Sequence, residues 1–198
     1  MDEIVHRAMR KWPNVPHCYG WLALDARGNW RMRDEHAQQC NFAGDKIVHA
    51  ALLAFINRNY ASDTAGCWYF QNGPQRVYVN LEATPFIART DPADGLILHT
   101  GDPITAIDAV WLTDTGKLIL CTAERIALVD DRDLGHCLQW VRTATGVIDD
   151  QCLLNWIADP ADHIAPMLTY RKQTIPIGHL TESSIAERFG FTPAPLPQ

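Results

Sequence analysis

Apolar and polar residues alternate along the middle of this chain in a pattern that is typical of paired β-strands. Between residues 21 and 33 the alternation runs on both sides of a turn that contains Gly28, which predicts an antiparallel hairpin. A second hairpin is predicted at 67–79, because Asn72-Gly73 supplies the positive backbone dihedral angles of a tight turn. Further strands are expected at 96–99, 104–112 and 125–129, and residues 110–120 repeat the pattern of strand, turn and strand. These patterns predict a sheet-rich, mostly antiparallel middle region.

Helical spacing of apolar residues is clearest from Gly44 to Tyr60, with Asp45 available as an N-cap. Shorter helices are expected at 3–12, 134–142, 149–158 and 182–189, and one more strand at 167–177. The last residues contain Pro193, Pro195 and Pro197, which we interpret as a frayed, proline-rich tail.

The predicted fold class is therefore α+β, antiparallel and β-rich, with two related β units, a packed helix at about 44–60 and a helical carboxy-terminal region. The expected domains are an N-terminal α+β unit at 1–90 and a C-terminal β unit at 91–198, which carries the helical extension and the tail.

Composition narrows the function classes. The chain has 198 residues, a 47% hydrophobic share and a formal charge of −6, which is ordinary globular composition and argues against a nucleic-acid partner. Bases outnumber acids between residues 1 and 33, and acids dominate from 91 to 114. These regions are either solvated faces of opposite sign or a basic amino-terminal edge that meets an acidic partner or ligand.

The six cysteines are scattered without a CxxC pair, which is typical of reduced thiols in the cytoplasm. The first residues carry charges where a signal peptide needs an apolar run, and no stretch approaches the roughly 20 apolar residues of a membrane span. We therefore expect a soluble, cytoplasmic protein without a membrane partner.

Motifs for catalysis and cofactor binding are missing from the sequence. It contains no GxSxG, SxxK, HExxH, CxxC, GxxxxGK[ST] or GxGxxG motif. His36 and Cys40 form a pair at helical spacing, but buried thiols and satisfied histidines explain such residues more simply than a metal site does. The run Asp130, Asp131 and Asp133 is best explained as the end of a strand and the cap of the next helix. We assign no catalytic residue, no metal ligand and no cofactor.

The second hairpin holds the densest group of candidate ligand-binding residues. On a strand, Arg76, Tyr78, Asn80 and Glu82 share one face, while the alternate positions 77, 79 and 81 are apolar and face the core. The polar face is either a solvated sheet surface or the wall of a groove between the two β units. An arginine beside a tyrosine suits an anionic or aromatic ligand. The candidate ligand-binding residues are Trp68, Tyr69, Gln75, Arg76, Tyr78 and Glu82.

Short motifs follow one another in a set order between about residues 18 and 142: Gly28-Asn-Trp30, Tyr69, the segment 75–79 and the segment Glu82-Ala-Thr-Pro-Phe-Ile-Ala88. In this order they resemble an uncharacterised proteobacterial family of unknown function. Asn72-Gly-Pro74 departs from the family pattern, in which a Thr-Pro turn is usual. The resemblance implies duplicated α+β units, the second similar to a pleckstrin-homology domain, and a ligand-binding or signalling role at the interface between the repeats.

The leading hypothesis is a protein that binds a small anionic ligand or a protein partner without turnover. The alternative is an unrecognised hydrolase or transferase that uses a Cys/His or His/Asp arrangement assembled from distant parts of the chain. A third option is a homo-oligomer that assembles through the apolar surface of its seven tryptophans.

Overall fold

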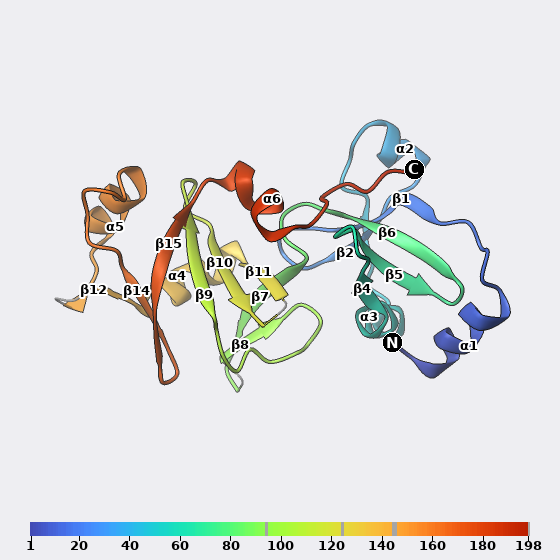
Figure 1. The fold of residues 1–198 in the computed structure, drawn as a ribbon, viewed down its shortest axis with the longest axis horizontal. Helices are drawn as coiled ribbons and strands as arrows, with labels where there is room; N and C mark the ends of the chain where they lie inside the picture. Colours follow the sequence, from blue (N-terminus) through green and yellow to red (C-terminus); the bar gives the residue numbers. More distant parts are fainter. Residues whose placement is uncertain (94, 124, 144–145, 198) are drawn as a thin grey trace. The chain divides into compact units, whose positions relative to one another are not determined.

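The computed structural model describes residues 1–93, 95–123, 125–143 and 146–197 (Figure 1). It forms two compact units, Met1–Pro85 together with Phe189–Gln198, and Phe86–Arg188. Sheets and helices occur in both units, so the predicted α+β class is confirmed. The prediction that separate domains meet near residue 90 stays a prediction. The units are called the first unit and the second unit below.

A six-stranded sheet, in the order β3-β2-β1-β6-β5-β4, forms the centre of the first unit. Its strands are β1 (Cys18–Leu24), β2 (Trp30–Met32), β3 (Asp45–Lys46), β4 (Tyr60–Ser62), β5 (Trp68–Asn72) and β6 (Gln75–Leu81). Both predicted hairpins, β1 with β2 and β5 with β6, are confirmed. The central pair, β1 with β6, is parallel, a long-range pairing that local alternation does not predict.

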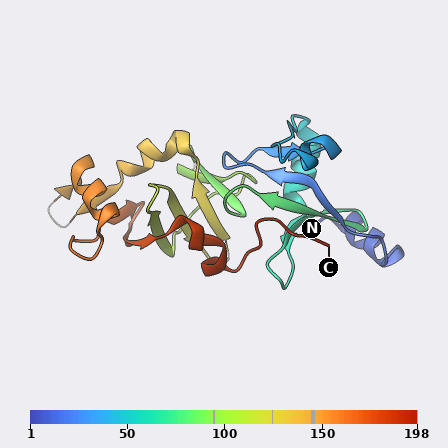
Figure 2. The same cartoon turned by 90° about the horizontal axis from the view of Figure 1, so that it is seen from above.

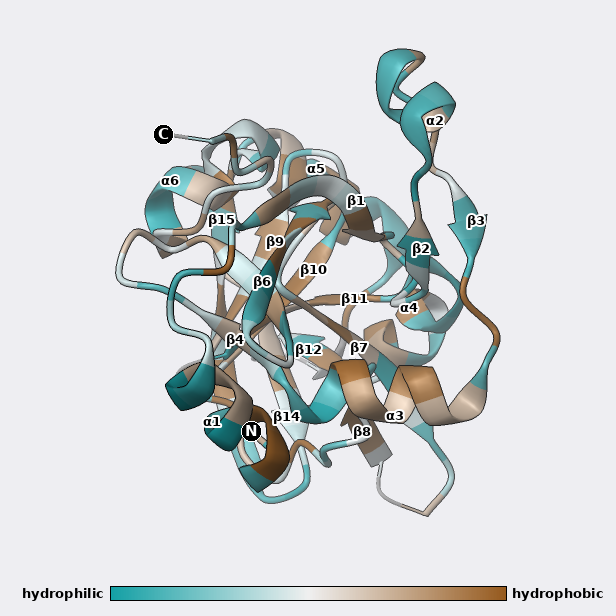
Figure 3. Ribbon diagram, turned by 90° about the vertical axis from the view of Figure 1, so that its right-hand side faces the viewer, coloured by the Kyte–Doolittle hydropathy of each residue, from teal (hydrophilic) through white to brown (hydrophobic). Residues whose placement is uncertain are grey.

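Helix α3 (Ala50–Arg58) covers one face of this sheet. Its Phe55 ring meets Phe70 of β5 edge to face at 5.4 Å, and Trp30 of β2 donates a hydrogen bond from Nε1 to Asn57 Oδ1 at 2.7 Å. Ile56 is 1% exposed between these contacts. Figure 3 shows α3 as hydrophobic over most of its length, whereas α2 (Glu35–Gln39) is mostly hydrophilic. Helix α1 (Glu3–Lys11) precedes the sheet in sequence.

The predicted start of the α3 helix at Gly44, with Asp45 as its cap, is wrong. Asp45 and Lys46 form β3 instead, because they pair with Met32 and Arg31 of β2. The helix begins six residues beyond Gly44, at Ala50, after the N-cap His49, whose ring nitrogen accepts from the Leu52 amide. Pairing with a neighbouring strand overrides the helical periodicity here.

The carboxy-terminal segment is packed, which corrects the expectation of a frayed tail. Leu81 donates its amide to the Pro193 carbonyl at 2.7 Å, and Thr192 donates to the Gly66 carbonyl at 3.0 Å. Phe191 is 7% exposed. The pairing of β5 with β6 ends at Tyr69 and Tyr78, before β6 reaches Leu81, so the tail occupies the side of β6 that β5 leaves open. Prolines lack an amide donor, but their carbonyls still accept hydrogen bonds.

The second unit is built on a nine-stranded sheet, in the order β13-β12-β14-β15-β9-β10-β11-β7-β8. Its strands are β7 (Phe86–Asp91), β8 (Gly95–Leu98), β9 (Ala109–Thr113), β10 (Leu118–Thr122), β11 (Arg125–Val129), β12 (Val141–Thr143), β13 (Gly146–Val147), β14 (Met167–Tyr170) and β15 (Gln173–Leu180). Its helical segments are α4 (Asp131–Leu138), α5 (Asp150–Ala158), η1 (Glu182–Ser184) and α6 (Ile185–Phe189), the last of which ends where the chain returns to the first unit (Figure 2).

Three expectations for the second unit need correction. The strand predicted at 104–112 is shorter and begins at Ala109. The single strand predicted at 167–177 is a hairpin, β14 and β15, whose turn contains Arg171 at a φ of 52°. Helix α4 starts earlier than predicted and its cap is Asp130, which accepts from the Arg132 amide at 3.0 Å. The acidic run therefore does cap this helix, but one turn earlier.

Candidate functional site

The face of the first unit's sheet opposite α3 carries the polar residues that the sequence singled out. Arg76 and Tyr78 of β6 pair with Gln71 and Tyr69 of β5, which places these four side chains on one face. The Arg76 guanidinium lies over the Tyr69 ring at 4.5 Å, and the Tyr78 hydroxyl donates to Asp63 Oδ2 at 3.0 Å. Hydrogen bonding to Tyr78 and the nearby Asp63 charge raise the pKa of Arg76. This cation therefore already has the Tyr69 ring, Tyr78 and the Asp63 charge as neighbours within the protein.

The other candidate residues lie in different surroundings. Trp68 and Gln75 occupy alternate positions to Tyr69 and Arg76 and so face the other side of the sheet. Trp68 packs on the Tyr60 ring at 4.8 Å, and Gln75 donates to the Pro16 carbonyl at 3.0 Å. The structure brings together Tyr69, Arg76 and Tyr78 only.

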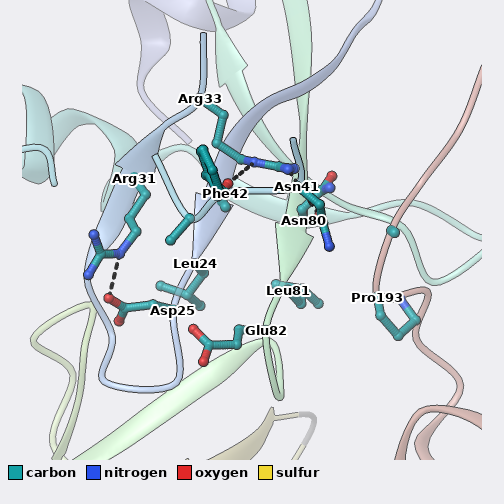
Figure 4. A pocket seen from close by; sticks show the side chains of 13 residues that line it. Leu24, Asp25, Arg31, Arg33, Asn41, Phe42, Asn80, Leu81, Glu82 and Pro193 are labelled. Carbon is teal, nitrogen blue, oxygen red and sulfur yellow. Dashed lines mark hydrogen bonds and ion pairs between the residues drawn. The ribbon is translucent and has the colours of Figure 1, made fainter. Parts of the chain in front are cut away.

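A groove lies farther along the same face, beside the ends of β1 and β6 (Figure 4). Its volume is about 390 Å³, near the lower end of the range of roughly 300–1,000 Å³ for small-molecule sites. Asn80 of β6 pairs with Ala23 of β1 at its centre, and Glu82 follows β6 directly. The residues that line it are Ala23, Leu24, Asp25, Arg31, Arg33, Asn41, Phe42, Ala43, Asn80, Leu81, Glu82, Pro193 and Ala194.

Arg33 is the most unusual residue of the groove, because it is only 6% exposed. Its Nε donates to the Phe42 carbonyl at 3.0 Å, and its Nη2 donates to the Ala37 carbonyl at 3.4 Å and to Asn41 Oδ1 at 3.2 Å. Across the described ranges, no carboxylate forms an ion pair with it. A buried cation held by neutral oxygens alone lacks the counter-charge that normally offsets its desolvation.

Arg33 also shapes the loop around it. The segment between β2 and β3 folds back over its side chain, and Asn41 adopts a φ of 52° there. Gly44 has a φ of 81°, and a Cβ at this position would lie 2.3 Å from the Met32 carbonyl oxygen. Asparagine and glycine tolerate left-handed backbone better than other residues. The wall of the groove is therefore a folded loop with a fixed conformation.

The second arginine of the groove is neutralised. Arg31 donates from Nε to Asp25 Oδ2 at 2.8 Å, and Asp25 also accepts from the Arg27 amide and from Asn29. Burial raises the pKa of Asp25, but the hydrogen bonds from Asn29, Arg31 and Arg27 outweigh it and hold this pKa below its ordinary value. Asp25 stays ionised and pairs with Arg31, so this pair adds little net charge to the groove.

Sequence reasoning named Glu82 among the site residues and placed Asn80 on the polar face, but it missed Arg33, Asn41 and Phe42. The sequence feature that pointed toward Arg33 is the excess of bases in the amino-terminal region. One interpretation of that excess was an edge that meets an acidic partner or ligand. Burial separates Arg33 from the other bases of that region, and burial of a charged residue depends on tertiary packing. No local pattern distinguishes it from an exposed arginine.

Other site classes find less support in the structure. Where the chain is described, no three His, Cys, Asp or Glu side chains gather as metal ligands. All six cysteines are free thiols. Among the helices of the described ranges, none combines the length and the apolar character required to cross a bilayer.

Residues 1–196 match the family DUF2944, described as "Protein of unknown function (DUF2946)". The chain belongs to this family. The resemblance to an uncharacterised family is thus confirmed at that level, while a proteobacterial origin and a pleckstrin-homology-like second unit stay predictions. No curated protein matches the sequence significantly.

The crystal structure of a DUF1285 family protein from Silicibacter pomeroyi DSS-3, solved at 2.50 Å resolution, is similar in fold. It has a TM-score of 0.50 and 13% sequence identity, and the match covers 95% of this chain and 100% of that chain. At this identity the likeness concerns the fold alone, and function must be argued from the site.

Proposed function

We propose that this protein binds a small anionic ligand in the groove of the first unit, without turnover, and that the anionic group meets Arg33. The observation that carries the proposal is a guanidinium that is 6% exposed, borders a groove and forms no ion pair in the described part of the chain. Nε and Nη2 of Arg33 already donate to Phe42, Ala37 and Asn41, and Nη1 has no hydrogen-bond partner among the described residues, so Nη1 is left to donate to an anionic oxygen such as that of a carboxylate.

Two further groups support a ligand at this place. Asn80 projects from the centre of the open sheet face, and Figure 4 shows it beside Asn41 and the guanidinium end of Arg33. Phe42 is 57% exposed although it lines the groove, so its ring offers an apolar surface at the rim. Amides beside a cation and an apolar rim are the usual lining of a small-molecule site.

The experiment compares two arginines that share a sheet face. Differential scanning fluorimetry with acetate, succinate, glutamate and inorganic phosphate, followed by calorimetric titration, measures binding to wild type, Arg33→Met, Asn80→Ala and Arg76→Ala. We expect Arg33→Met to weaken carboxylate binding by about tenfold or more, since a charge-assisted hydrogen bond is lost. Asn80→Ala should weaken it severalfold, and Arg76→Ala should bind like wild type.

Arg33 also holds the loop through the Phe42 and Ala37 carbonyls, so Arg33→Met could lose binding because the loop unfolds. Asn80→Ala leaves those hydrogen bonds intact and therefore tests the groove independently. Circular dichroism establishes which variants are folded. Loss of binding in Arg76→Ala with retention in Arg33→Met and Asn80→Ala would move the site to the Tyr69, Arg76 and Tyr78 cluster that the sequence predicts. Absence of binding by every probe would overturn the proposal.

One contact favours the alternative, a hydrolase or transferase. Cys40 Sγ lies 3.8 Å from His36 Nδ1, and both residues are exposed near the loop that walls the groove. A thiol beside an imidazole is the minimal arrangement for nucleophilic catalysis. Turnover in an esterase or phosphatase screen that disappears in Cys40→Ala would establish this function in place of simple binding.

Ligand binding without turnover is compatible with a signalling or regulatory role. A protein partner, self-association and a cytoplasmic location belong to the same proposal as predictions from the sequence. Light scattering of the purified protein measures the oligomeric state directly.

A further inference from the structure

The charges of the groove do not all have the same sign. Of its four ionisable side chains, Asp25 and Arg31 form an ion pair with each other at 2.8 Å. Two remain, the cation Arg33 and the anion Glu82. Neither forms an ion pair with another residue in the ranges that the structure describes.

Glu82 is held in place yet keeps an oxygen for a ligand. Its Oε2 accepts from the Ala26 amide at 3.0 Å, which fixes the side chain against the β1–β2 turn. The residue is exposed, and it follows β6, whose Asn80 lies at the centre of the groove. A carboxylate that is anchored through one oxygen can accept from a ligand donor with the other.

Neutral residues separate the two unpaired charges. In the view of Figure 4, Leu24 and Leu81 lie between Arg33 and Glu82, and both border the groove, although they are only 1% and 6% exposed and belong to the core. Asn80 adds a neutral amide beside the cation. A ligand that complements this lining has an anionic end, an apolar or neutral middle and a cationic end.

We infer that the ligand is a zwitterion, a free amino acid or short peptide, whose carboxylate meets Arg33 and whose ammonium group meets Glu82. This inference rests on the proposed binding function and names its ligand class. A compound with a single anionic group would compensate Arg33 but would leave the negative charge of Glu82 unused. A zwitterion compensates both, and its zero net charge suits a lining whose formal charges cancel. The volume of about 390 Å³ accommodates molecules of this size.

Ligands that carry both charges are compared with matched ligands that carry only one, so that the contributions of Arg33 and Glu82 to binding are measured separately. Calorimetric titration of the full chain compares 6-aminohexanoate with hexanoate and hexylamine, and L-leucine with 4-methylpentanoate. We expect the better zwitterion to bind about tenfold or more tightly than its matched acid, and the amine alone to bind weakest.

The decisive variant is Glu82→Gln, because the amide oxygen can still accept from Ala26 while the charge is removed. It should lower zwitterion affinity by about tenfold and leave the affinity for the matched acid unchanged or higher. Glu187→Gln, at an exposed acid of α6, is the control and should change neither affinity.

The possible results test zwitterion binding separately from the proposed binding of an anion at Arg33. If acids bind through Arg33 but zwitterions bind no tighter, and Glu82→Gln changes nothing, the zwitterion inference is overturned and anion binding stands. If no probe binds, or if Arg33→Met and Asn80→Ala both bind like wild type, both proposals are overturned.

Discussion

At the scale of single residues, Asp63 connects a turn to the face of the first unit's sheet that carries Tyr78. Its Oδ1 accepts from the amides of Ala65 and Cys67, and its Oδ2 accepts from the Tyr78 hydroxyl, each at 3.0 Å. Burial raises the pKa of Asp63, but these hydrogen bonds and the positive charge of Arg76 outweigh it and lower the pKa. The folded protein therefore stabilises the ionised carboxylate.

The lowered pKa of Asp63 predicts a pH-dependent contribution to stability. A folded pKa below the unfolded value of about 3.9 gives stabilisation that is fully present above that value and is lost as the pH falls through the folded pKa. Asp63→Asn should reduce the free energy of unfolding by about 1–2 kcal/mol at pH 7, because a charged acceptor is lost. Below the folded pKa the variant and wild type should converge. Urea unfolding at pH 7 and in acid measures both values.

Asp162→Asn, at an exposed aspartate, is the control and should match wild type throughout. An equal loss for Asp63→Asn at both pH values would show that its charge has no part in stability. The same residues surround Arg76, whereas Arg33 borders the groove, which is why the proposed ligand site lies at Arg33 instead.

At the scale of elements, the carboxy-terminal segment belongs to the first unit and forms one wall of its groove. Pro193 and Ala194 line the groove, and the Pro193 carbonyl accepts from Leu81. The segment passes very close to Gly66, where a Cβ would lie 2.1 Å from the Gly190 carbonyl oxygen. A side chain at this glycine would push the segment away from the sheet.

Two glycines, one on each side of that contact, test it, because both have positive φ and only at Gly66 would an added Cβ meet the opposing backbone. Gly66 has a φ of 73°, and Gly190 has a φ of 66° with nothing within 4 Å of its would-be Cβ. Each alanine substitution adds backbone strain of about 1–2 kcal/mol. Gly66→Ala should lower the free energy of unfolding further than Gly190→Ala and should expose the segment to proteolysis. Urea unfolding and mass spectrometry of protease digests measure these effects. Equal behaviour of the two variants would show that the segment is loosely held.

The elements also show what a sequence can predict. Both hairpins of the first unit followed from alternation and from turn residues; of the predicted pair Asn72-Gly73, Gly73 has a positive φ and Asn72 does not. The start of α3 and the packing of the tail could not be predicted from local sequence patterns. Each depends on pairing with a strand that is distant in the sequence: β3 pairs with β2, and the tail binds Leu81 at the end of β6. The groove has the same origin, since Arg33 becomes a site residue only when the loop around Asn41 folds over it.

At the scale of the whole chain, the second unit is inserted into the first. The chain leaves the first unit after Pro85 and returns to it at Phe189. The second unit is continuous in sequence and has its own core, in which Ile87, Ile119 and Leu168 are each at most 1% exposed. The first unit needs both of its segments, because the Leu81 amide finds its acceptor in the returning tail.

This arrangement predicts an asymmetry between fragments. The segment Phe86–Arg188 should fold alone and melt cooperatively, because its strands pair with one another and its core is continuous. The segment Met1–Pro85 alone should be much less stable, and joining Phe189–Gln198 to it through a flexible Gly/Ser linker should restore a cooperative transition. Near-ultraviolet circular dichroism and calorimetry of the three polypeptides measure the difference. If Phe86–Arg188 stays unfolded while the joined first unit folds, then the inserted unit depends on the first, and the two are one folding domain instead of two.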